Sequence, residues 1–187
     1  MTAHVSDRIP LREECDKLMA LYSMRPHIVN HSIQVMRVCL AITDNLKNGL
    51  AINRDLVIAA ALLHDITKTR SLATNERHDI TGGELLREMG FTSIAEIVEQ
   101  HVFFQNLNPH GKLEEREIIY YADKRVMHDE IVTIDERIHD LLQRYGNAEH
   151  IKNIILKNKN LILAVERKIA GFMKIDIHRA IEGIKTG

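Results

Sequence analysis

The stretch that decides the fold is LVIAAALLHD, residues 56–65. Eight apolar residues follow one another before His64 and Asp65, which is typical of a central helix that is buried on all sides. Asn53 precedes the run at a suitable distance to cap the helix N-terminus. A charged side chain is costly to bury unless it is paired or binds a metal. The stretch therefore predicts a buried helix that ends at a polar site, although a helix end facing water would also explain the dipeptide alone.

Working outward from this stretch, helical signals recur and strand signals do not. Leu11, Cys15, Leu18 and Tyr22 recur at helical spacing. We expect a loop at KTRSLATNER (68–77), helices over 27–47 and 113–130, and one long helix from Asn147. Ser/Thr and Glu three residues apart predict capping boxes at Ser93/Glu96 and Thr133/Glu136. The fold class is all-α: a single helical bundle with an N-terminal helix (1–26), a core (27–130) and C-terminal helices (131–187) that pack on or extend it.

Composition excludes several classes of protein. The chain has 187 residues, 45% of them hydrophobic, and its 25 Lys and Arg nearly balance 26 Asp and Glu. A general nucleic-acid binder carries a clear basic excess, so no nucleic-acid partner is expected. No apolar run approaches the roughly 20 residues of a membrane span, so no membrane partner is expected either. Two cysteines without a CxxC motif, and no signal sequence, predict a cytoplasmic protein.

Two more ionisable residues lie on apolar helical faces. His31 follows Ile28 by three residues and precedes Val35 by four. Asp123 follows Ile119 by four and shares its face. Each alone could be a satisfied core residue, although a lone buried Asp is rarer than a lone buried His. Imidazole and carboxylate ligands together suit divalent Fe, Mn, Co, Ni or Zn.

The order His31, His64-Asp65, Asp123 resembles the HD superfamily of metal-dependent phosphohydrolases, whose signature is H…HD…D. The surrounding segments resemble it too: HSIQVMRVCLAI (31–42), AALLHDITK (60–68) and IIYYADKRV (118–126). The resemblance covers about residues 27–128 and implies an HD-domain fold, with these four residues as metal ligands.

Two further histidines, His78 and His101, stand between the HD dyad and Asp123. His78 precedes a helix, and His101 follows Ile97 by four residues on an apolar face. Some HD enzymes, including the branch of symmetrical diadenosine tetraphosphate hydrolases that this segment resembles, show H…HD…H…H…D. That resemblance implies a second metal held by His78 and His101, with Asp65 bridging both ions.

The resemblance implies hydrolysis of a phosphoester or phosphoanhydride of a small, nucleotide-like substrate by a metal-activated water. Asp65 and Lys68 are the expected catalytic residues, and one turn separates them. Lys68, Arg70, Arg77 and Lys124 are expected to bind substrate. The absence of a GYP motif, and Lys68 in place of an acidic residue, disfavour cyclic dinucleotides and alarmones as substrates. The alternatives are a mononuclear, nucleotidase-like phosphomonoesterase and a non-catalytic regulatory module. The C-terminal helix is a candidate oligomer interface.

Overall fold

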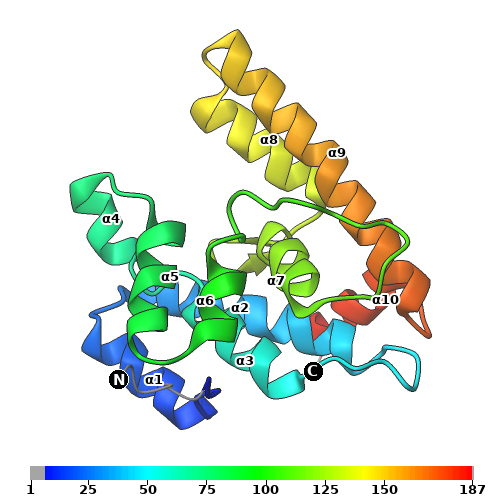
Figure 1. The fold of residues 1–187 in the computed structure, drawn as a ribbon. Helices are drawn as coiled ribbons and strands as arrows, with labels where there is room; N and C mark the ends of the chain where they lie inside the picture. The colour runs from blue at the N-terminus through cyan, green and yellow to red at the C-terminus, as the bar shows by residue number, and fades with distance from the viewer. Residues whose placement is uncertain (1–6, 187) are drawn as a thin grey trace.

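The computed structural model describes residues 7–186, and within them the expected all-α class is confirmed (Figure 1). Residues 1–6 of the predicted N-terminal segment and residue 187 of the predicted C-terminal segment lie outside this range. The elements are α1 (Arg12–Leu21), α2 (Pro26–Thr43), α3 (Arg54–Leu63), α4 (Lys68–Thr74), α5 (His78–Glu88), α6 (Thr92–Val98), α7 (Glu115–Lys124), β1 (Val126–Met127), β2 (Glu130–Ile131), α8 (Ile134–Tyr145), α9 (Glu149–Phe172), α10 (Ile177–Glu182) and a 3-10 helix (Gly183–Thr186).

Helix α3 lies at the centre, as its composition predicts. The Asn53 side chain accepts hydrogen bonds from the N–H groups of Asp55 and Leu56 and so begins the helix. Residues 59–63 are wholly buried, and α3 packs against α1, α2, α6 and α7. Because burying one Leu side chain contributes about 1.5–3 kcal/mol, this packing fixes the end of α3, where His64 and Asp65 lie.

The loop expected at residues 68–77 is wrong over most of its length, because Lys68–Thr74 form helix α4. The segment has no glycine or proline before Asn75, so nothing in its composition opposes a helix. Ser71 Oγ donates to the carbonyl of Lys68 at 2.9 Å. Asn75, in the left-handed region at φ 57°, ends the helix. Lys68 therefore begins a helix directly after the HD dyad.

The helix expected over 113–130 is shorter than predicted and ends at Lys124. A two-stranded hairpin follows, in which Val126 pairs with Ile131 and Met127 with Glu130. His128, at φ 57°, takes the positive φ that a two-residue hairpin turn requires. This turn brings the backbone of residue 128 against α2.

Helices α8 and α9 lie side by side and project from the rest of the structure (Figure 1). The capping box of Thr133 and Glu136 is confirmed, and Gly146 occupies the C-cap position of α8. The capping box at Ser93 is wrong: Phe91 occupies the N-cap position of α6, and Ser93 bonds Asp7 instead. Between residues 7 and 186, no helix combines the length and apolar character needed to span a bilayer.

The base of α9 is attached to α7 by buried polar contacts. Lys168 donates to Glu117 at 2.6 Å, with both side chains almost fully buried. Tyr121 on α7 donates to Glu166 at 2.5 Å. Breaking a buried pair by removing one partner costs about 3–5 kcal/mol, so these contacts hold the α8–α9 hairpin in a defined position beside α7.

Candidate metal centre

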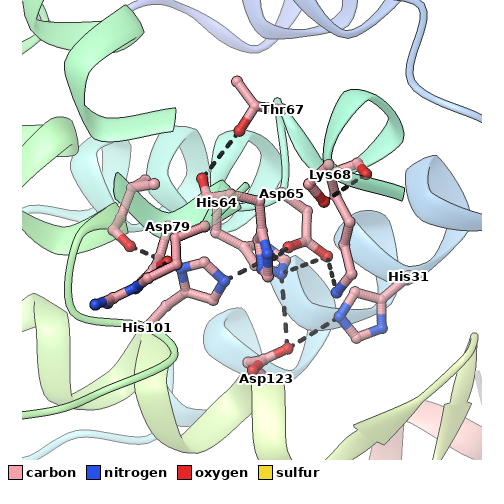
Figure 2. A network of polar contacts seen from close by, with 12 residues as sticks. His31, His64, Asp65, Thr67, Lys68, Asp79, His101 and Asp123 are labelled. Atoms are coloured by element: carbon pink, nitrogen blue, oxygen red, sulfur yellow. Dashed lines mark hydrogen bonds and ion pairs between the residues drawn. The ribbon is translucent and has the colours of Figure 1, made fainter. Parts of the chain in front are cut away.

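The structure brings together all six residues predicted as metal ligands, and Figure 2 labels all of them except His78. They come from five segments: the second turn of α2, the residues directly after α3, the first position of α5, the segment that follows α6, and the last turn of α7. The six residues are His31, His64, Asp65, His78, His101 and Asp123.

One half of the cluster is formed by His31, His64, Asp65 and Asp123. The distance from Asp123 Oδ1 is 3.0 Å to His31 Nε2 and 3.6 Å to His64 Nε2. His64 Nε2 lies 3.5 Å from Asp65 Oδ2. Ligand atoms of His31, His64 and Asp65 lie within 4.8 Å of one another, which is close enough for one ion to contact all three.

The other half is formed around the second oxygen of the same carboxylate. Asp65 Oδ1 lies 3.2 Å from His78 Nε2 and 3.5 Å from His101 Nε2. These three residues form a second group whose ligand atoms lie within 4.8 Å of one another. Asp65 therefore turns one oxygen toward each half.

Hydrogen bonds to backbone carbonyls orient three of the histidines. The Nδ1 atoms of His31, His64 and His101 lie 2.7, 2.8 and 2.7 Å from the carbonyls of His128, Ala61 and Val98. A carbonyl only accepts, so each Nδ1 carries the proton, and in the neutral ring each Nε2 offers a lone pair. Such bonds from the non-ligating nitrogen are typical of metal-binding histidines.

Several buried atoms at the centre have no hydrogen-bond partner within residues 7–186: His64 Nε2, His78 Nε2 and Asp65 Oδ1. A buried polar atom without a partner is costly. Imidazole lone pairs that face a carboxylate oxygen repel it unless a cation lies between them. The donor set and its orphaned atoms therefore fit divalent cations.

The electrostatics of the centre favour ionised carboxylates and attract positive charge. Burial lowers the pKa of His64, but Asp65 and Asp123 outweigh this and raise it, so a bound cation would take the place of a proton on His64. Burial opposes ionisation of Asp65, yet the charges of His64 and Lys68 outweigh it and hold the pKa of Asp65 well below its usual value. Asp123 behaves likewise, with Lys124 as the largest favourable cause of its lowered pKa. Burial lowers the pKa of His101, which keeps that ring neutral. Metal ligation requires neutral imidazole and ionised carboxylate.

The four predicted substrate-binding cations are placed differently. Lys68 Nζ donates to Asp65 Oδ2 at 2.9 Å and lines the pocket beside the centre. Lys124 is buried and donates to Asp123 Oδ2 at 2.5 Å. It therefore contacts a predicted metal ligand from the buried side. Arg70 pairs with Glu76, and Arg77 donates to Asp79 at 2.5 Å. The structure does not bring Arg70 or Arg77 to this pocket.

The pocket beside the centre has a volume of about 350 Å³, within the usual range for small-molecule sites. His31, Asp65 and Lys68 form its floor. Residues that the sequence interpretation missed form much of the rest. They are His128, Leu72, and the α8 residues Arg137, Leu141, Arg144 and Tyr145. The spacing of Arg137, Leu141 and Arg144 at i, i+4, i+7 places them on one helix face, but the sequence does not indicate that this face lines a pocket.

Comparison with known proteins identifies the family of the chain. The family model for the HD domain matches residues 28–128, more than half of the chain. The chain belongs to the HD domain family. The match ends before α8, so the arginine-bearing wall of the pocket lies outside it.

Curated relatives include proteins from three organisms. An uncharacterized protein of Methanocaldococcus jannaschii is 31% identical over 150 residues, covering 72% of this chain and 88% of that protein. A tRNA (cytidine(56)-2'-O)-methyltransferase of Thermoplasma volcanium is 34% identical over 95 residues, and one of Picrophilus torridus is 26% identical over 166 residues. These matches cover 50% and 82% of this chain but only 26% and 46% of the two methyltransferases. No solved structure gives a significant match.

Proposed function

We propose that the protein is a metal-dependent phosphohydrolase with two divalent ions, which cleaves a phosphoester or phosphoanhydride of a nucleotide-like substrate. The observation that carries this proposal is the position of Asp65, whose two oxygens face separate histidine groups. Membership of the HD domain family supports the hydrolase class. The orphaned His64 Nε2, His78 Nε2 and Asp65 Oδ1 support occupation by cations.

His31, His64 and Asp123 would hold one ion, His78 and His101 the other, and Asp65 would contact both. Bound divalent ions supply Lewis acidity, which activates water for attack on phosphorus and neutralises developing charge. The chain's own contribution is to hold these ligands rigidly through the carbonyls of His128, Ala61 and Val98. Preorganised ligands and donors need no rearrangement as the transition state forms.

Lys68 would orient the phosphate and stabilise its charge. Its ammonium group is bound to Asp65 Oδ2 and lines the pocket. Burial lowers the pKa of Lys68, but the charges of Asp65 and Asp123 outweigh this and raise it overall. The side chain therefore stays cationic at neutral pH, which is the form that binds a phosphate oxygen.

The remaining pocket wall supports a nucleotide-like substrate. Leu72, Leu141 and Tyr145 provide apolar surface, while Lys68, Arg137 and Arg144 provide positive charge. A molecule that carries both a planar apolar part and a phosphate matches this combination. Tyr145 is 58% exposed, so its ring is free to stack against a base.

The test is a metal-reconstituted screen on the full chain. The protein is stripped with EDTA, reloaded with Mn, Fe, Co, Ni or Zn, and assayed against nucleotides, dinucleoside polyphosphates and cyclic nucleotides. We expect stripping to abolish phosphate release and reloading to restore it. Full activity in metal-free protein would refute the proposal. One ion per chain with full activity would favour a mononuclear phosphomonoesterase, and metallated protein without turnover would favour a regulatory module.

A further inference from the structure

Helix α8 presents two arginines to the pocket on one face. Arg137 Nη1 donates to Asp140 Oδ2 at 3.1 Å, and Arg144 Nη2 lies 2.7 Å from Asp140 Oδ1. Both guanidinium groups thus share one carboxylate, and the trio keeps one net positive charge. Ordinary helix-surface pairs match one cation to one anion, whereas this arrangement holds two cations together.

The arginine pair has unused hydrogen-bonding capacity. A guanidinium carries five N–H donors. Arg137 Nε is buried and has no hydrogen-bond partner within residues 7–186. The Arg137 side chain is only 20% exposed, so water satisfies it poorly. An anion bound in the pocket, which Arg137 lines, would offer further acceptors to this guanidinium.

One residue, His128, connects the arginine pair to the metal centre. Arg144 Nη2 lies 3.3 Å from His128 Nε2, and the carbonyl of His128 accepts from His31 Nδ1 at 2.7 Å. Lys68 and Arg137 line the same pocket, where the positive charge of Arg137 lowers the pKa of Lys68. A phosphate between Lys68 and the metal ligands would therefore leave Arg137 and Arg144 facing the next group of the substrate.

We propose that Arg137 and Arg144, held by Asp140, form a second phosphate site that selects substrates with at least two linked phosphates over phosphomonoesters. This inference rests on the proposed hydrolytic function. Paired arginines suit the site because their planar donors bind phosphate oxygens two at a time. Since α8 lies beyond the matched family region, the selectivity would be a property of this chain's C-terminal helices.

The test measures binding to metal-loaded full-length protein by calorimetry, with two probes that resist hydrolysis. Methylenediphosphonate carries two linked phosphonates and methylphosphonate carries one. We expect Arg137→Gln and Arg144→Gln each to weaken methylenediphosphonate binding about tenfold, roughly the loss of one charge-assisted hydrogen bond, and methylphosphonate binding less than about threefold. Arg144→Lys should recover part of the loss because it keeps the charge without the planar fork.

The matched control is Arg54→Gln, which removes an exposed arginine that also pairs with an aspartate, Asp44, but lies away from the pocket. It should leave both affinities unchanged. Equal losses for the two probes, or no loss in either α8 variant, would overturn the proposal. A preference for methylenediphosphonate that depends on these arginines, in a protein that hydrolyses nothing, would preserve the anion site and refute the phosphohydrolase function.

Discussion

The two halves of the His/Asp cluster are built differently. His31, His64 and Asp123 project from α2, the end of α3 and α7, which pack on one another through the core. In the other half, His78 is the first residue of α5, and its side chain is 21% exposed against 0% for His64. The carbonyl of His78 accepts a hydrogen bond from Thr67 Oγ1 at 2.9 Å. The other histidine of this half, His101, is only 2% exposed. The first half therefore comes from helices that pack in the core, whereas the second combines one buried histidine with one at a partly exposed helix start.

Asp65 belongs to both halves, so its loss should have the largest effect. We expect Asp65→Ala to abolish binding of both ions and to lower kcat by about 10³-fold or more, the upper range for one electrostatic stabiliser. Metal analysis and steady-state kinetics measure this. Asp44→Ala, which removes an exposed aspartate at the C-terminus of α2, should behave as wild type. Two tightly bound ions and a near-normal rate in Asp65→Ala would show that the wrong dyad has been identified.

Asp123 contacts only the first half, which allows that half to be tested alone. An amide is a weaker, uncharged ligand, so Asp123→Asn should lose one ion and lower kcat by roughly 10²–10³-fold. The second ion should remain, because Asp65, His78 and His101 are unchanged. If the variant keeps two ions per chain, Asp123 is a structural residue that orients His31.

His78 and His101 test the second half. Either residue changed to Ala should reduce the metal content from two ions toward one and lower kcat by about 10²-fold, with a smaller change in KM. Circular dichroism should show a folded chain, because the core and the first half remain. His139→Ala, an exposed histidine on α8, is the control. Wild-type stoichiometry and kcat in both variants would establish the mononuclear alternative.

Lys68 contacts the shared residue Asp65 but is not a ligand, so its effect should be smallest. Lys68→Gln should keep two ions and lower kcat about tenfold, equal to roughly 1.4 kcal/mol of transition-state stabilisation. Lys68→Arg should recover part of the rate. A loss of metal in Lys68→Gln would instead show that the ammonium group serves only to position Asp65.

The difference between the halves also explains what the sequence could predict. His31, His64 and Asp123 break apolar helical patterns, so their inward direction follows from periodicity. The role of α8 could not be predicted in this way, because Arg137, Asp140 and Arg144 look like an ordinary solvated face with i, i+3 and i, i+4 pairs. Their position over the pocket depends on long-range packing of α9 on α7, through Lys168 and Glu117. The local sequence of α8 does not reveal that contact.

The most direct test of the two-ion centre is a titration of chelator-stripped wild-type protein with Mn, followed by metal content and by turnover of a substrate found in the screen. The account predicts saturation at two ions per chain, with the rate rising mainly as the second ion binds, because both sites share Asp65. Saturation at one ion per chain with the full rate already reached would contradict it.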